Sequence, residues 1–261
     1  MLLTLYLILS VGAALAAGIT GAAWYTVLLT AVGAFFGLLV LHLLLMCVLA
    51  LFVDKENPPE RAFGFFLWFV TESVSLLLKL GRVRVRLEGA EKLPEGGCLL
   101  VQNHLSDFDP ISLYPALKGR RLRFVSKQEN LAIPVGGRLM AGAGVIGLDR
   151  ENNRQGVLVM RKAAAYIKAG DTVCVYPEGT RSKTGALGPF RDGCFKAALW
   201  AGAPIAVVTV KGSEDVKKNI FRRRTDVRFR VVRVFSYDEI AGKKTDEISA
   251  LVRTQILAGC R

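Results

Sequence analysis

The sequence predicts an α/β domain, in which a sheet is flanked by helices, placed behind an N-terminal helical region that spans a membrane. Two observations predict this arrangement. The first 53 of the 261 residues contain no Asp, Glu, Lys or Arg, although the whole chain has a net charge of +13. From Arg82 onward, short apolar strands alternate with helices, as in a largely buried sheet covered on both faces. This second part is long enough for one domain with a sizeable core.

The uncharged region consists of two apolar stretches, residues 2–17 and 22–53, separated by Gly-Ile-Thr-Gly. A spanning helix needs about 20 residues, so the region crosses either twice as a hairpin or once with a long tilt. Gly18 and Gly21 suit a turn, which favours the hairpin. A signal peptide is the alternative for the first stretch, but the basic n-region is missing. We therefore expect residues 1–57 to be a membrane anchor.

The basic excess points to an acidic partner, which can be nucleic acid, an anionic membrane surface or a phosphorylated substrate. The apolar anchor favours the membrane. Basic residues follow the anchor and none precedes it, so the positive-inside rule places the globular part on the cytoplasmic face. The residues concerned are Lys55, Arg61, Lys79, Arg82, Arg84 and Arg86. Five cysteines without a C-x-x-C pair suggest neither a disulfide framework nor a zinc site.

Residues 58–81 are expected to form an amphipathic helix at the membrane surface. Pro58 and Pro59 break the chain, and residues 60–80 then repeat apolar side chains at spacings of three and four. Phe65 and Trp68 widen this face, and Trp favours the headgroup level. Alternatively the apolar stripe packs on the soluble core, and both contacts can hold at once.

Residues 82–261 form the predicted α/β domain. Its first strand follows Arg82, because Val83, Val85 and Leu87 alternate with charged residues. Further strands are expected at residues 98–102, 122–126, 145–148, 172–176, 205–210 and 227–235. Helices are expected at 110–117, 131–141, 154–169, 190–201 and 245–257, and exposed basic loops at 183–187 and 211–224.

His104 is the first candidate for chemistry. The buried strand 98–102 delivers it to a carboxyl end, where open α/β sheets place their ligand crevices. The other histidine, His42, lies in the apolar anchor, so His104 is the histidine available as a base near neutral pH. A turn can bring Asp109 onto one ring nitrogen and leave the other free to take a proton. Alternatively Asp109, which precedes Pro110, caps a helix.

A second run, Pro-Glu-Gly-Thr-Arg-Ser at residues 177–182, follows the strand at 172–176. Gly179 permits a tight turn, and the fork of Arg181 suits phosphate oxygens. Thr180 places a hydroxyl between them. Glu178 cannot bind phosphate directly, so we expect it to orient Arg181 or the substrate. An ordinary turn with a surface arginine is the alternative. Together the two runs supply a base and an anion clamp, which we expect to share one open cavity.

The pair N-H-x-x-x-x-D and P-E-G-T-R-S, in this order, resembles the 1-acylglycerol-3-phosphate acyltransferase family. Gly-Leu-Asp-Arg at 147–150 is similar to the family's second motif, and the Pro-led apolar strand at 203–208 to its fourth. Pro-Phe-Arg-Asp-Gly at 189–193 also fits. Gly147 and Leu148 depart from the family by replacing a bulkier pair.

The resemblance implies the glycerolipid acyltransferase fold, with a mixed sheet, and acyl transfer without an acyl-enzyme, cofactor or metal. His104, held by Asp109, would deprotonate the sn-2 hydroxyl of lysophosphatidate, which then attacks the thioester of acyl-CoA or acyl-carrier protein. Arg150 and Arg181, with Lys127, would hold the glycerol phosphate. Backbone amides around Gly179 would stabilise the oxyanion.

Two other functions are considered. An acyltransferase for another lyso-lipid or for glycerol 3-phosphate would use the same motifs. A membrane-anchored protein that binds nucleic acid or anionic lipid without chemistry is disfavoured, because the basic segments lack the interleaved aromatic residues expected of a single-strand binder. Ser106 is not expected to be a nucleophile, because it lacks a G-x-S-x-G setting.

Overall fold

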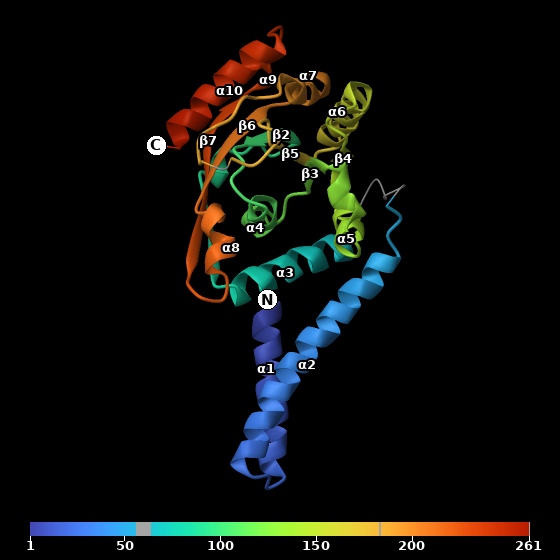
Figure 1. The fold of residues 1–261 in the computed structure, drawn as a ribbon, viewed down its shortest axis with the longest axis vertical. Coiled ribbons are helices and arrows are strands. Elements are labelled where there is room, and N and C mark those ends of the chain that lie inside the picture. Colours follow the sequence, from blue (N-terminus) through green and yellow to red (C-terminus); the bar gives the residue numbers. More distant parts are fainter. Residues whose placement is uncertain (56–63, 183, 261) are drawn as a thin grey trace.

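A hairpin of two helices projects from one end of an α/β domain (Figure 1). The structure is a computed structural model, and it describes residues 1–55, 64–182 and 184–260. The hairpin consists of α1 (Leu2–Ile19) and α2 (Trp24–Leu51), and Gly21 adopts a left-handed φ of 78° in the turn between them. Both helices are long and apolar enough to cross a membrane, judged by length and composition. At 1.5 Å per residue, the shorter helix is about 27 Å long.

His42 is a structural residue of this hairpin. Its Nδ1 lies 2.8 Å from the Tyr6 hydroxyl on α1, and its Nε2 lies 3.0 Å from the hydroxyl of Ser73. Both ring nitrogens therefore have partners, as a buried polar side chain requires. These contacts join both hairpin helices to the next helix.

That helix, α3 (Gly64–Leu80), lies across the domain end of the hairpin (Figure 1). Phe66 and Val70 pack into the core of the domain, whereas Phe65 and Trp68 are exposed on another face. The expected packing on the core is therefore present, and an aromatic face remains free for a second contact. The predicted break at Pro58 and Pro59 and the predicted start at Glu60 lie outside the described residues.

The domain contains a seven-stranded mixed sheet in the order β1-β7-β6-β2-β5-β3-β4. Only the β6–β7 pair is antiparallel among the strand pairs of the described chain. The strands are β1 (Val83–Glu88), β2 (Cys98–Gln102), β3 (Leu122–Lys127), β4 (Ile146–Leu148), β5 (Thr172–Val175), β6 (Ile205–Lys211) and β7 (Thr225–Phe235). Every residue of the central strand β2 is buried, because helices cover both faces of the sheet.

One face packs against α3, α4 (Phe108–Ala116) and α5 (Gly136–Gly142), and the other against α6 (Asn153–Lys168), α7 (Lys196–Ala201) and α10 (Thr245–Gly259). The expected α/β architecture with a mixed sheet is confirmed. Two short helices, α8 (Val216–Asn219) and α9 (Tyr237–Ile240), complete the domain. The predicted loop at 211–224 is thus partly helical.

Two predicted helices are shorter than expected. The segment 131–141 is divided into a 3-10 turn, Gln128–Ala132, and α5. Pro134 lacks an amide donor and Val135 has a φ of 51°, so a continuous helix cannot form there. The segment 190–201 likewise begins with a 3-10 turn, Asp192–Phe195, before α7.

Candidate active site

The two runs meet because β2 and β5 are parallel neighbours, with Val101 opposite Val175. Their carboxyl ends therefore open at the same edge of the sheet. Two hydrogen bonds join the segments that follow: the amide of Ser182 donates to the carbonyl of His104 at 2.8 Å, and the amide of His104 donates to the side-chain carboxylate of Glu178 at 3.0 Å.

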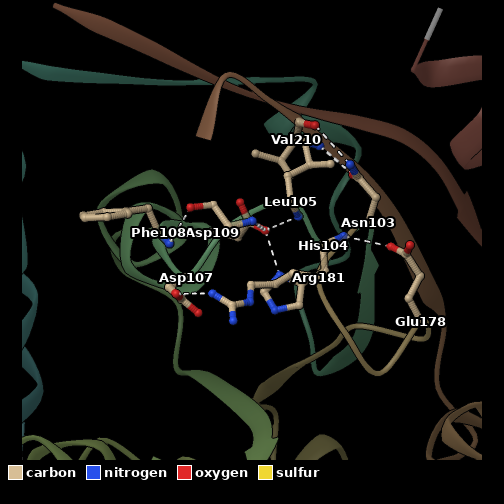
Figure 2. A network of polar contacts seen from close by, with 10 residues as sticks. Asn103, His104, Leu105, Asp107, Phe108, Asp109, Glu178, Arg181 and Val210 are labelled. Atoms are coloured by element: carbon tan, nitrogen blue, oxygen red, sulfur yellow. Dashed lines mark hydrogen bonds and ion pairs between the residues drawn. The ribbon is translucent and has the colours of Figure 1, made fainter. Parts of the chain in front are cut away.

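Asn103 anchors the first segment to the sheet. Its side-chain Nδ2 donates to the carbonyl of Val210 at 3.1 Å, and its Oδ1 accepts the amide of Val210 at 2.8 Å (Figure 2). The amide side chain thus replaces a peptide group and continues the ladder between β2 and β6. No role for this side chain was predicted from the sequence.

His104 and Asp109 form the expected contact, with Nδ1 2.8 Å from Oδ2 (Figure 2). The same carboxylate oxygen accepts the amides of Leu105 at 2.7 Å and Ser106 at 2.9 Å. Asp109 is fully buried, whereas the side chain of His104 is 15% exposed. A carboxylate accepts and does not donate, so Nδ1 carries the proton. Nε2 has no partner in the described chain and presents its lone pair.

Asp109 is not the N-cap of α4. The helix is preceded by Asp107, whose side chain makes no capping bond, and Asp109 lies in the first turn. The alternative reading of Asp109 as a cap is therefore wrong. Its carboxylate instead binds the turn that carries His104.

Tyr176 supports the imidazole from one side. The two rings are stacked, with centroids 4.0 Å apart and planes inclined by 22°. Burial raises the pKa of Tyr176 well above its usual range, so the phenol is neutral. The sequence analysis treated Tyr176 only as the end of a strand, and no local pattern signals this contact.

Glu178 is buried and joins the loop after β2 to the far part of its own loop. One oxygen accepts the amide of His104, and the other accepts the amide of Gly188 at 2.8 Å. These bonds do not include Arg181, which it was expected to orient. Arg181 instead forms an exposed ion pair with Asp107 (Figure 2). Thr180 is exposed in the same turn.

The predicted cations are not gathered around one pocket. A pocket of about 470 Å³ is lined by Arg150 and Gly179, together with Tyr176, Arg191 and Lys196. Neither His104, Arg181 nor Lys127 belongs to this lining, so the expected cavity shared by the imidazole and Arg181 is not this pocket. The Nζ atom of Lys127 lies 2.6 Å from Glu129.

The wall of this pocket is strongly basic. Burial, and then the charge of Arg191, lower the pKa of Arg150. Gly179, with a φ of 68°, makes room for Arg191, because a Cβ there would lie 3.1 Å from its Nε. The sequence analysis placed Arg191 in a family segment without assigning it to the site. Within the described residues, no group of three His, Cys, Asp or Glu side chains is arranged to hold a metal ion.

Comparison with known proteins decides the family. Residues 84–211, which include both runs, match the family model described as Acyltransferase. Residues 84–211 form a domain of the acyltransferase family. The fold of the chain is similar to the crystal structure of the 1-acyl-sn-glycerophosphate (LPA) acyltransferase PlsC from Thermotoga maritima, with a TM-score of 0.57 and 21% identity. That match covers 74% of this chain and 80% of the other.

Curated relatives of the chain include the chloroplastic 1-acyl-sn-glycerol-3-phosphate acyltransferase BAT2 of Brassica napus, which is 33% identical over 207 residues. This alignment covers 78% of the chain and 58% of the relative. The 1-acyl-sn-glycerol-3-phosphate acyltransferase alpha of Bos taurus is 33% identical over 171 residues, which are 65% of the chain and 59% of that protein. The chain thus spans less than two thirds of the length of these relatives.

Proposed function

We propose that this acyltransferase transfers an acyl chain from acyl-CoA or acyl-carrier protein to the sn-2 hydroxyl of lysophosphatidate, giving phosphatidate. The names of its relatives support this acceptor. The observation that carries the proposal is the buried Asp109 carboxylate holding Nδ1 of His104, with Nε2 left free at the edge where β2 and β5 end.

In this mechanism His104 is the general base. Its Nε2 removes the hydroxyl proton as the oxygen attacks the thioester carbonyl, and Asp109 stabilises the resulting imidazolium. The C–S bond then breaks, and the leaving thiolate of the donor takes the proton from the imidazolium of His104. Tyr176, stacked on the ring and neutral, limits its rotation without adding charge.

The developing oxyanion needs amide donors. The amide of Gly179 already donates to the carbonyl of Tyr176 at 2.9 Å. In the described chain the next two amides, those of Thr180 and Arg181, have no backbone partner. These two amides are therefore the better candidates for stabilising the oxyanion. In other enzymes a single donor of this kind lowers the activation free energy by roughly 3–4 kcal/mol.

Arg181 and Lys127 would hold the phosphate of the acceptor. Both are paired with exposed carboxylates, Asp107 and Glu129, and exposed pairs of this kind are worth only about 0–1 kcal/mol. A phosphate that binds the guanidinium with two hydrogen bonds can displace such a partner. Arg150 adds a cation at the neighbouring pocket.

The hairpin would keep the enzyme at its lipid substrate. Each methylene of an acyl chain costs about 0.8 kcal/mol to expose to water, so a reaction at the bilayer surface avoids a large penalty. Basic residues after the anchor support a catalytic domain on the cytoplasmic face, at an anionic membrane surface. Nucleic acid is not among the expected partners.

The test is to incubate the protein in lipid vesicles with lysophosphatidate and labelled acyl-CoA, beside the His104→Ala variant. We expect phosphatidate from the wild type and a loss of about 10²–10⁴-fold in the variant, the usual contribution of a general base. Thermal unfolding of both proteins checks that the variant is folded. Equal product from both would exclude His104 as the base. Acyl-carrier protein as donor, and glycerol 3-phosphate or lysophosphatidylcholine as acceptor, are parallel arms that define the substrates.

A further inference from the structure

A basic turn connects β6 and β7 on the side of the domain near the hairpin. We define it as residues 217–224, and it contains five cations: Lys217, Lys218, Arg222, Arg223 and Arg224. Only Arg224 has an acidic partner in the described chain, Asp226 at 3.1 Å. The other four cations are therefore available to an external anion.

A phenylalanine stands in the middle of these cations. Phe221 is 66% exposed and has a φ of 64°, a backbone region that bulky residues rarely adopt. The carbonyl of Asn219 accepts the amides of both Arg222 and Arg223 at 2.8 Å, which fixes the turn. A single exposed aromatic ring is ordinary on a protein surface. Phe221 differs from such a residue because it lies among four cations without acidic partners in the described chain, on the side of the domain near the hairpin.

The basic turn is attached to the end of α3. Ile220 packs so closely on Gly81 that a Cβ there would lie 2.9 Å from its Cγ1. The carbonyl of Arg82 accepts the amide of Thr225 at 3.1 Å. Figure 1 shows α8 and the turn after it reaching the level of α3 and of the N-terminal end of α1, where the hairpin leaves the domain. If the hairpin crosses a bilayer, this level corresponds to the lipid headgroups.

We propose that the basic turn is a second membrane contact, in which Phe221 inserts among the headgroups of an anionic bilayer and the surrounding cations bind lipid phosphates. This proposal rests on the membrane placement of the hairpin given above. Aromatic side chains favour the headgroup level, and clustered Lys and Arg are attracted to anionic lipid over about 10 Å. A hairpin alone lets the domain tilt. A second contact would fix the orientation of the active site relative to the lipid.

The test uses the full chain with Phe221→Trp, reconstituted in vesicles of brominated phosphatidylglycerol, and compares its fluorescence with that of the wild type. The difference reports position 221, because Trp24, Trp68 and Trp200 are present in both proteins. We expect the added tryptophan to be blue-shifted and quenched. Both effects should disappear in brominated phosphatidylcholine, and when Lys217, Lys218, Arg222 and Arg223 are also changed to Gln.

Tyr237→Trp is the matched control, because Tyr237 is a half-exposed aromatic residue beyond the other end of β7. Its added tryptophan should not be quenched. If the wild-type tryptophans are quenched but position 221 is not, the hairpin is in the bilayer and the basic turn is not, which overturns this proposal alone. If neither is quenched, the membrane placement fails as well. A blue shift caused by an oligonucleotide without lipid would overturn the proposal in favour of a nucleic-acid partner.

Discussion

At the scale of single residues, Asp109 combines two roles in one carboxylate oxygen. This oxygen, Oδ2, accepts hydrogen bonds from Nδ1 of the His104 imidazole and from two backbone amides of the turn that carries His104. An amide side chain at this position could keep its oxygen on these three donors, because the other carboxylate oxygen, Oδ1, has no partner in the described chain. What the amide lacks is the negative charge that stabilises an imidazolium at His104.

We expect Asp109→Asn to lower kcat by about 10²–10⁴-fold, because the imidazolium that forms when His104 takes the proton would lose the negative charge beside it. Asp107→Asn makes the same chemical change two residues away, on an exposed carboxylate, and should preserve kcat. Steady-state kinetics of both variants, with thermal unfolding measured in parallel, separates the effects. Similar losses of kcat in the two variants would contradict the role given to Asp109.

Arg181→Gln tests the phosphate site. Loss of a charge-assisted contact worth about 1.5–3 kcal/mol should raise KM for lysophosphatidate by roughly 10–100-fold. Monoacylglycerol, which has no phosphate, should be used equally well by wild type and variant. Arg84→Gln is the control, because Arg84 lies on β1, the outermost strand on one side of the sheet and three strands away from β2. A matching loss with monoacylglycerol would show that Arg181 does not act on the phosphate.

The sequence located His104, Asp109, Glu178 and Arg181 at one edge of the sheet, because strand ends can be recognised from buried apolar runs. It could not assign Asn103 or Tyr176. Asn103 bonds a residue 107 positions away, and Tyr176 stacks on a ring from another strand end. Such contacts depend on the register of the folded sheet, which no local pattern encodes.

At the scale of elements, strands were predicted more closely than helices. The segment 98–102 matches β2 residue for residue, because four of its five side chains are apolar and only Gln102 is polar. The helix predicted at 131–141 ignored Pro134. The helix α8 has four residues, fewer than two turns, so periodicity could not reveal it inside a basic segment.

The contact of α3 with the loop after α4 depends on a buried carboxylate. Glu72 is 2% exposed, and Lys118 donates to it at 2.6 Å. Burial raises the pKa of Glu72, but the hydrogen bonds and charges of Lys118 and of the N-terminal ammonium group of Met1 together outweigh burial, and the net shift is downward. A folded-state pKa below the unfolded value stabilises the protein above that unfolded value, and the gain is lost as pH falls.

We therefore expect Lys118→Met to lower the free energy of unfolding by about 1–2 kcal/mol at pH 7, a discounted value because the lysine is largely exposed. The difference from wild type should shrink as the pH falls below the ordinary range of a glutamate, about 4.3. Unfolding in detergent micelles at several pH values measures this, with Lys162→Met as an exposed control. A difference independent of pH would argue against the ion pair.

At the scale of the whole molecule, the hairpin and the domain are joined by buried polar contacts as well as by a connecting segment. His42 on α2 bonds both Tyr6 on α1 and Ser73 on α3, and α3 in turn packs into the core of the domain. The distance between the catalytic edge of the sheet and the bilayer would therefore be set by the packed structure.

The hairpin arrangement predicts on which side of the membrane its turn and the domain lie. If both helices cross the membrane, the turn at Thr20 lies on the face opposite the domain. In a background with Cys47, Cys194 and Cys260 changed to Ser, the two remaining cysteines, Cys98 and Cys174, are fully buried. Thr20→Cys should then react with a membrane-impermeant maleimide in intact cells, and Arg84→Cys only after permeabilisation. Labelling of both positions only after permeabilisation would exclude the double crossing. Labelling of Arg84→Cys in intact cells would place the domain on the wrong side for a cytoplasmic acyl donor.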